Sequence, residues 1–354
     1  MTPIDHTRAT VDQLAEFDTI LDARSPSEFA EDHIPGAINC PVLDDEQRIV
    51  VGTLYKQVSA FDARKLGSVL VARNIATHIE KLFSDKPKGW TPLVYCWRGG
   101  QRSGAFTHIL REVGWQARRL TGGYKSWRHH VIEQLEIVPK PLRFIVVAGP
   151  TGSAKTRILE AMQQQGQQVL NLEALAAHKG SVLGDLPGQP QPSQKGFETL
   201  VLDAISRFDP ARPVYVESES KRIGQLRVPD AVFQGIQDGN WLRVQASMEQ
   251  RVQFLLRDYD YFLSGPELEQ QLERLKESCG GETVARWKGL AQAKDFSTLV
   301  AELLAQHYDR FYLRSMNKHA EGAEHLSFAT DDLSDAGIAA LAKQIAASAG
   351  QTPI

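Results

Sequence analysis

A cysteine flanked by glycines and arginines is the first group in this sequence with the features of a nucleophile. It follows an apolar stretch, residues 93–95, that we expect to be a buried strand, and apolar residues at helical spacing run from 103 to 110. The loop between them is Cys96-Trp97-Arg98-Gly99-Gly100-Gln101-Arg102-Ser103. The helix N-terminus and the two arginines would stabilise a thiolate, the reactive form of cysteine. We therefore predict that Cys96 is catalytic and that residues 97–102 form its active-site loop.

The residues of this loop leave other interpretations open. Cys96, Arg102 and Ser103 also satisfy the Cys-x5-Arg-Ser pattern of cysteine-dependent phosphatases, in which the arginine binds phosphate through two hydrogen bonds. A free cysteine can also be a small buried packing residue, and this is our interpretation of Cys40 and Cys279, which lack such surroundings. Three widely spaced cysteines argue against a disulfide framework and against a cysteine-ligated zinc site.

A second glycine-bearing loop has the spacing of a phosphate-binding motif. The apolar run 144–148 is typical of a strand buried on both faces, and it leads into Gly149-Pro150-Thr151-Gly152-Ser153-Ala154-Lys155-Thr156. Backbone N–H groups of such a loop cradle phosphate, Lys155 would neutralise it, and the Thr156 hydroxyl is a candidate ligand of Mg²⁺. Ala154 replaces the motif's second glycine. We expect Ala154 to have helical dihedral angles, which suit alanine, but the departure leaves open whether ATP is bound or hydrolysed.

A carboxylate at the end of another strand would support this motif. The apolar residues 213–216 predict a strand, and Glu217 follows them directly, with Glu219 two positions later. An acid at this place in phosphate-loop proteins orients Mg²⁺ or water. We take Glu217 as the first candidate for this role and Glu219 as the second.

Basic residues are concentrated around the reactive cysteine. Between residues 93 and 130 there are seven Lys or Arg residues and one acid, with Trp and Tyr residues among them. This mixture suits phosphate contacts combined with base stacking, although a solvated face over core aromatics would have the same composition. Our candidates for RNA contacts are Arg118, Arg119, Lys125 and Arg128.

These groups need two scaffolds to position them. A chain of 354 residues is too long for one ordinary core, and two strand–loop–helix units indicate an α/β fold with parallel sheets. We place a first domain at 1–133, a linker at 134–142, where Pro139 and Pro141 oppose a helix, and a second domain at 143–354 with a helical C-terminal part. We expect a cytoplasmic protein, because no apolar run is long enough to span a membrane and no secretory signal begins the chain.

Several segments carry a resemblance to a known family. Residues 22–29, 33–39 and 120–127 resemble the characteristic motifs of rhodanese domains, of which the loop at Cys96 is the reactive part. A rhodanese-like domain followed by a phosphate-loop domain resembles the bacterial tRNA 2-selenouridine synthases, and the segments 51–56, 171–181, 216–224 and 307–310 are similar to that family as well. In the rhodanese motifs we expect Asp22 and Arg24 to pair structurally and His33 to stabilise a turn.

The resemblance implies a reaction and its substrates. The family replaces sulfur by selenium in 2-thiouridine at the tRNA wobble position, uses selenophosphate, and transfers a geranyl group from geranyl diphosphate to the sulfur. It implies contact with the anticodon region of tRNA, a separate enzyme that supplies selenophosphate, and no tightly bound cofactor. Which domain binds geranyl diphosphate stays open. The alternatives are a rhodanese-type tRNA sulfurtransferase with an ATP-dependent activation domain, or a nucleotide-gated scaffold in which the rhodanese-like domain is a binding module.

Overall fold

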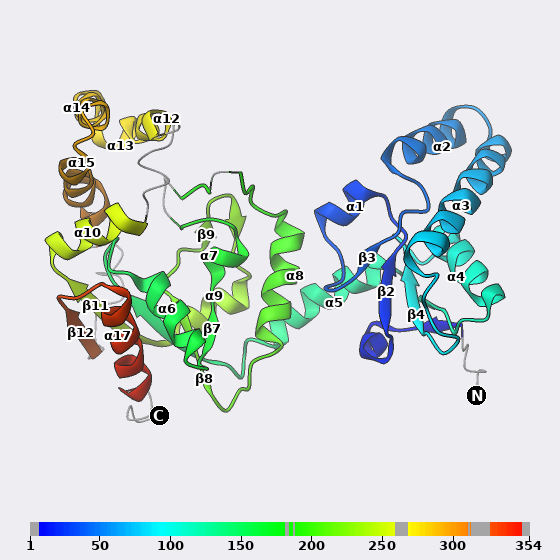
Figure 1. Cartoon of the computed structure of the whole chain (residues 1–354), viewed down its shortest axis with the longest axis horizontal. Helices are drawn as coiled ribbons and strands as arrows, with labels where there is room; N and C mark the ends of the chain where they lie inside the picture. The colour runs from blue at the N-terminus through cyan, green and yellow to red at the C-terminus, as the bar shows by residue number, and fades with distance from the viewer. Residues whose placement is uncertain are drawn as a thin grey trace. The chain divides into compact units, whose positions relative to one another are not determined.

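Two compact units, each built on its own parallel sheet, make up the protein in the computed structural model (Figure 1). The structure describes residues 7–180, 184–186, 188–258, 268–310, 312 and 326–348. Unit 1 comprises the residues up to Leu135 and the segment Pro192–Asp203, and unit 2 comprises Glu136–Gln191 and the residues from Ala204 onward. These units differ in their bounds from the predicted 1–133, 134–142 and 143–354. Helix α5 (Tyr124–Ile137) continues into the expected linker and stops only before Pro139, and Pro192–Asp203 groups with unit 1.

The sheet of unit 1 brings the ends of two central strands together beside Cys96. Its order is β1-β5-β4-β2-β3, and every neighbouring pair is parallel. Asp22 at the end of β2 pairs in register with Tyr95 at the end of β4, so the chain leaves both strands at the same edge. The strands are β1 (Arg8–Ala9), β2 (Thr19–Asp22), β3 (Ile38–Asn39), β4 (Pro92–Tyr95) and β5 (Arg118–Leu120).

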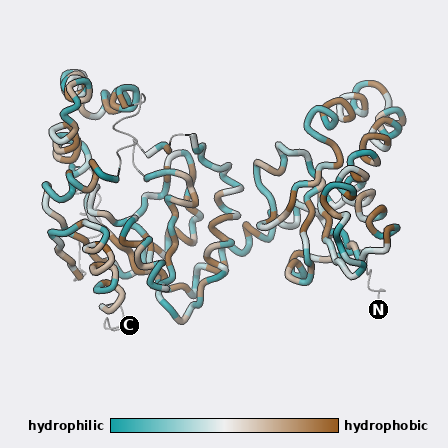
Figure 2. The backbone as a smooth tube through the Cα atoms, in the orientation of Figure 1, coloured by the Kyte–Doolittle hydropathy of each residue, from teal (hydrophilic) through white to brown (hydrophobic). Residues whose placement is uncertain are grey.

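Helices of unit 1 enclose a core that includes Cys96. Leu21 and Val94 from the strands, Ile75 from α3 and Phe106 from α4 are fully buried, and they belong to the same hydrophobic cluster as Cys96. The helical elements are η1 (Val11–Glu16), α1 (Pro26–Glu31), α2 (Asp45–Gln57), α3 (Ala60–Leu82), α4 (Gln101–Val113) and α5. Along α3 the tube alternates between hydrophilic and hydrophobic colours, as expected of helices with one buried face (Figure 2).

Unit 2 also contains a five-stranded parallel sheet, but its strand order differs from that of unit 1. Its sheet is β12-β11-β6-β8-β7 with all neighbours parallel, and a two-stranded antiparallel hairpin lies apart from it. The α/β expectation, with a parallel sheet in each part, is therefore confirmed. The strands are β6 (Arg143–Ala148), β7 (Gln168–Leu170), β8 (Pro213–Glu217), β11 (Asn240–Ala246) and β12 (Leu326–Thr330), and the hairpin is β9 (Arg222–Ile223) with β10 (Leu226–Arg227).

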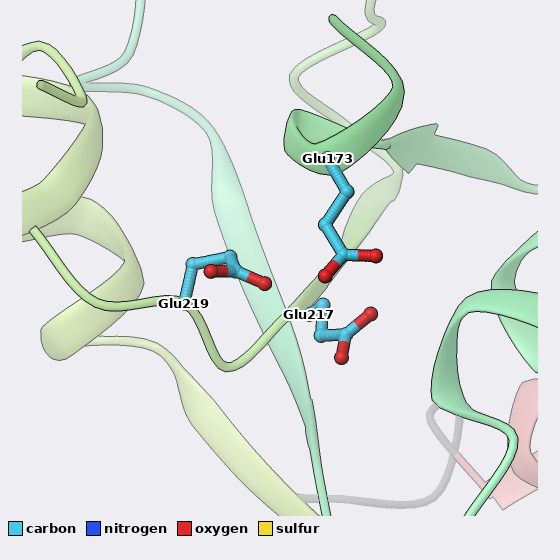
Figure 3. Close-up of side chains that lie close together, drawn as sticks. All are labelled: Glu173, Glu217 and Glu219. Carbon is cyan, nitrogen blue, oxygen red and sulfur yellow. The ribbon is translucent and has the colours of Figure 1, made fainter. Parts of the chain in front are cut away.

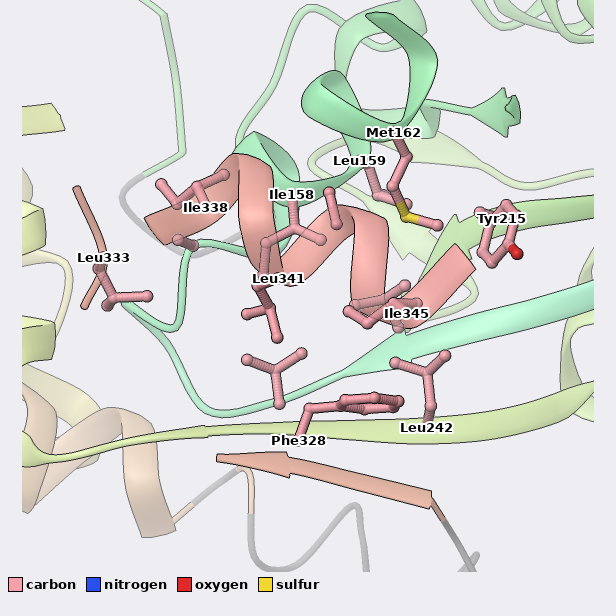
Figure 4. Close-up of a cluster of buried hydrophobic side chains, with 14 of the residues drawn as sticks. Ile158, Leu159, Met162, Tyr215, Leu242, Phe328, Leu333, Ile338, Leu341 and Ile345 are labelled. Atoms are coloured by element: carbon pink, nitrogen blue, oxygen red, sulfur yellow. The ribbon is translucent and has the colours of Figure 1, made fainter. Parts of the chain in front are cut away.

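The main core of unit 2 lies between the sheet and two helices that come from distant parts of the chain. Figure 4 shows Ile158 of α6 and Leu341 of α17 packed over the strands, where Leu242 and Phe328 complete the cluster. The helices are α6 (Lys155–Gln164), α7 (Leu172–Leu175), α9 (Asp230–Gln237), α10 (Met248–Asp258) and α17 (Asp335–Ser348). Helix α8 (Gln194–Ile205) lies almost entirely in the segment Pro192–Asp203 of unit 1.

The helical C-terminal part has a core of its own. Leu272, Trp287 and Leu299 are fully buried there and belong to one cluster. Its elements are α12 (Leu268–Glu273), α13 (Lys276–Cys279), α14 (Gly281–Gln292), α15 (Phe296–Leu303) and the π-helical turn η2 (Leu304–Tyr308). Among the residues that the structure describes, no helix has both the length and the apolar character needed to cross a membrane.

Candidate functional site

Cys96 lies where the sequence predicts it, between the end of β4 and the start of α4. Gly100 caps α4, whose first residue is Gln101. The Cys96 side chain is 3% exposed, and its Sγ lies 3.2 Å from the Ser103 hydroxyl of the same helix. The Cys96 thiol therefore lies at the N-terminus of α4, within hydrogen-bond distance of a hydroxyl.

The shape of this loop depends on glycines from two segments. Gly99 has φ +64°, and a Cβ there would lie 2.7 Å from the carbonyl oxygen of Leu120. Gly123, with φ +63°, packs so closely beneath the loop that a Cβ would meet the carbonyl oxygen of Cys96. The Tyr124 N–H donates to that same oxygen at 2.8 Å. The segment 120–127 is therefore the support on which the reactive loop rests.

Arg102 has a different partner from the one we expected. Its two terminal nitrogens lie 2.7 and 3.3 Å from the carboxylate oxygens of Glu28, and Arg48 Nε lies 3.1 Å from the same carboxylate. Burial would raise the pKa of Glu28, but Arg102, the Ser25 N–H and Arg48 together outweigh it and hold this pKa below its ordinary value. The expectation that Arg102 acts directly on the thiolate is not supported, and an arginine held by a carboxylate also weakens the phosphatase interpretation. Arg98 and Gln101 are exposed.

The charges at the neighbouring strand end are structural, as expected. Asp22 and Arg24 form a fully buried ion pair at 2.6 Å, and Arg24 also donates to the carbonyl of Asp32 at 2.7 Å and lies 4.0 Å from the ring of Tyr124. His33 stacks on Phe29 and bonds its backbone oxygen at 2.9 Å, which fits a turn-stabilising role.

The phosphate loop follows β6 and opens α6, as the motif requires. Gly149 approaches β11 so closely that a Cβ would lie 2.7 Å from the Val244 carbonyl oxygen, and Gly152 has φ +83°. Both positions therefore require glycine. The backbone of the loop is also held at Thr151, whose carbonyl oxygen accepts a hydrogen bond from Arg251 at 2.8 Å.

Ala154 corrects one expectation from the sequence. It has φ 60° and ψ 25°, in the left-handed region and not in the helical one. The reason is local: the chain must turn at this residue before α6 starts at Lys155. The conformation costs alanine roughly 1–2 kcal/mol, and burial of its methyl group in the unit 2 core offsets part of that cost.

Acidic side chains surround the functional groups of the phosphate loop. Lys155 Nζ lies 3.2 Å from Glu217, and the Thr156 hydroxyl lies within hydrogen-bond distance of both Glu217, at 3.0 Å, and Glu173, at 3.1 Å. Figure 3 shows the carboxylates of Glu173 and Glu217 pointing toward one another, with Glu219 beside them. One oxygen from each of the three lies within 4.8 Å of the others. Both predicted acids are thus placed at the loop.

Sequence reasoning missed Glu173. It lies in α7, directly after β7, and is 7% exposed. The available signal was an acid three positions after the strand 168–170, at the sheet edge where the phosphate loop also lies. Burial, and then repulsion by Glu217, raise the pKa of Glu173 to about 8, and the same causes raise that of Glu219 well above its ordinary value.

Such a group of oxygens fits a divalent cation. Mg²⁺ prefers carboxylate and hydroxyl oxygens, and a cation here would relieve the repulsion that raises these pKa values. Glu173, Glu217 and Thr156 are the residues that would hold it.

The four candidates for RNA contacts have different surroundings in unit 1. Arg118 lies 3.8 Å from Glu16, whereas Arg119, the next residue of β5, packs against Gly104 of α4. Arg128 is bonded to Glu198, within unit 1. Lys125 is exposed. A role of these residues in RNA binding stays a prediction.

Comparisons with known proteins cover both loops. A family model described as the tRNA 2-selenouridine synthase AAA domain matches residues 142–277, and a rhodanese-like domain model matches residues 7–130. The tRNA 2-selenouridine synthase of Alcanivorax borkumensis is 33% identical over 348 residues, 88% of this chain and 94% of that one. That of Nitrosomonas europaea is 34% identical over 247 residues, and the alignment spans 68% of this chain and 63% of the relative. A solved rhodanese-related protein from Thermoplasma volcanium covers 34% of this chain and 83% of its own, at 18% identity and a TM-score of 0.22.

Proposed function

Because the chain belongs to the tRNA 2-selenouridine synthase family, we propose that it converts wobble 2-thiouridine in tRNA into 2-selenouridine by way of an S-geranyl intermediate. The observation that carries the proposal is the presence of two different loops in one chain. One holds a buried thiol at a helix N-terminus, and the other holds Lys155 and Thr156 at the start of α6. The reaction needs both a site for selenium transfer and a site for a diphosphate.

In the first step the phosphate loop binds geranyl diphosphate. The sulfur of 2-thiouridine attacks the first carbon of the geranyl group, the carbon–oxygen bond breaks, and diphosphate leaves while the base loses its N3 proton. Lys155 neutralises the charge that develops on the leaving diphosphate. A Mg²⁺ ion held by Thr156, Glu217 and Glu173 would supply further charge neutralisation there. This use of the loop requires no nucleotide hydrolysis.

In the second step selenium replaces the alkylated sulfur at the loop of Cys96. The selenium of selenophosphate attacks C2 of the base and expels geranylthiolate, a far better leaving group than the sulfur of the thiocarbonyl. Water then cleaves the phosphorus–selenium bond, phosphate leaves, and N3 regains a proton. This sequence is redox-neutral. A perselenide on Cys96 would need an oxidant, because selenium in selenophosphate is fully reduced, so we assign Cys96 to contact and orient the donor.

The test is nucleoside mass spectrometry of tRNA from cells with and without the gene. We expect 2-selenouridine to disappear without the gene while 2-thiouridine persists. Loss of 2-thiouridine itself would instead favour a sulfurtransferase with an ATP-dependent activation domain. The proposal also requires a separate source of selenophosphate, and it places the enzyme in the cytoplasm with its tRNA substrates.

A further inference from the structure

A cavity in unit 1 opens beside the reactive loop. It measures about 570 Å³ and is lined by Ser27, Glu28, Glu31, Arg48, Trp97 and Arg102. Pockets for drug-sized ligands run from roughly 300 to 1,000 Å³, so a tetrahedral oxyanion such as selenophosphate would fill only a small part of this space. The volume therefore leaves room for a ligand with a ring system, and the lining offers it both an aromatic ring and two arginines.

One wall of the cavity is a fixed aromatic ring. Trp97, the residue after Cys96, stacks on Tyr124 with a ring-centre distance of 5.3 Å and an angle of 28° between the planes. Tyr124 is held in turn by Asp32, to which its hydroxyl donates at 2.8 Å. An indole supported in this way loses little freedom when a second ring stacks on it. Stacking of a base on an aromatic side chain contributes about 1–3 kcal/mol.

The charged side chains that line the cavity differ in how fully they are paired. Glu28 is engaged by Arg102 through both carboxylate oxygens and by Arg48 through Nε. Glu31 is paired with Lys195 at 2.7 Å, within the same unit. Each carboxylate thus has a cation, whereas Arg48, whose Nε lies 3.1 Å from Glu28, remains 47% exposed. Its outer nitrogens are therefore in a position to meet a phosphate group.

We propose that this cavity receives the target nucleotide of the tRNA, with the base stacked on Trp97 and a neighbouring backbone phosphate bound by Arg48. Glu28 is the positioning residue that fixes Arg48 and Arg102 along the wall. The inference rests on the proposed function, because it takes a thiouridine of tRNA as the ligand. It also explains how the base would reach Cys96. Cys96 directly precedes Trp97, so a base stacked on Trp97 would lie close to Cys96.

The test measures binding of the full-length protein to tRNA carrying 2-thiouridine at the wobble position, over a series of salt concentrations. Trp97→Leu should weaken binding roughly 10- to 100-fold, and Trp97→Phe, which keeps an aromatic face, should restore most of it. Arg48→Ala should reduce the slope of log affinity against log salt by about one phosphate contact. The matched control is Arg73→Ala, which removes an exposed arginine from α3 and should leave affinity and slope unchanged. Unchanged melting temperatures would show that the variants fold.

Crosslinking locates the base independently of turnover. With 4-thiouridine at the wobble position, irradiation should join the tRNA to residues 27–31 or 97–102. Crosslinks confined to unit 2, or wild-type tRNA affinity and salt slope in Arg48→Ala together with a raised KM for selenophosphate, would overturn the inference and make the cavity a site for the donor alone. Crosslinks at Trp97 in a protein that makes no selenouridine would instead leave the cavity assigned and overturn the proposed function.

Discussion

The loop at Cys96 and the loop at Lys155 have a similar backbone path but differ in the charged side chains around them. Each leaves the end of a central parallel strand, turns through a positive-φ residue and starts a helix. At Cys96 the nearby cation, Arg102, is already matched by Glu28. At Lys155 one ammonium faces three carboxylates, and burial together with repulsion between the carboxylates raises the pKa values of Glu173 and Glu219. The two loops thus share a backbone arrangement and differ in the charges that surround them, so we expect them to bind different ligands.

The largest effect on the phosphate loop should come from Lys155→Ala. Removing a charge-assisted contact costs about 1.5–3 kcal/mol, which corresponds to a loss of geranyl diphosphate affinity of roughly 10- to 100-fold. Calorimetric titration with geranyl diphosphate and with ATP would show which of them the loop serves. The control is Lys288→Ala, since Lys288 is also paired with a glutamate, at 2.6 Å, but lies in α14. Unchanged affinity for both ligands in Lys155→Ala would remove the loop from diphosphate binding.

Glu173→Gln should change how stability depends on pH. Because burial and Glu217 raise the pKa of Glu173 from 4.5 to about 8, the folded state keeps a proton in this window that the unfolded chain has lost. Stability therefore falls as pH rises through the window. Glutamine cannot ionise, so in EDTA the variant should be more stable than wild type by at least about 1 kcal/mol above pH 8. As the pH falls to the ordinary pKa of a glutamate, the free energies of unfolding of the two proteins should converge.

Urea unfolding at a series of pH values measures this difference. Glu249→Gln, at an exposed position of α10, should leave the pH dependence as it is. Mg²⁺ should stabilise wild type more than Glu173→Gln, because the variant has lost one of the proposed ligands. A variant less stable than wild type at high pH would mean that Glu173 contributes attraction and not repulsion to this cluster.

Ala154→Gly should have the smallest effect. Glycine removes the strain of the left-handed conformation, roughly 1–2 kcal/mol, but it also removes a buried methyl group worth about 1 kcal/mol. The free energy of unfolding should therefore stay within about 1 kcal/mol of wild type. Ala154→Val should be clearly destabilised, because β-branched side chains do not tolerate this conformation. A stable valine variant would show that the loop can adopt another backbone path.

The features that could be predicted from the sequence are those formed by residues close together in the chain. Both loops were predictable, because strand, loop and helix follow one another directly and their residue types are characteristic. Glu28 was not recognised as the partner of Arg102, since 74 positions separate them. Glu173 was missed for the same reason: only the sheet order brings the end of β7 near β8 and the phosphate loop. The conformation of Ala154 depends on the direction in which the chain enters α6, which residue types do not reveal.

The central claim is that the two loops serve two separable chemical steps, and Cys96→Ala tests it most directly. Alanine removes the thiol with little change in volume and leaves the phosphate loop intact. In tRNA from cells that express this variant, mass spectrometry should find no 2-selenouridine and an accumulation of S-geranyl-2-thiouridine. Cys279→Ala, which removes a half-buried thiol in unit 2, should give wild-type levels of both nucleosides. Wild-type 2-selenouridine in Cys96→Ala, or loss of both nucleosides from a folded variant, would contradict the claim.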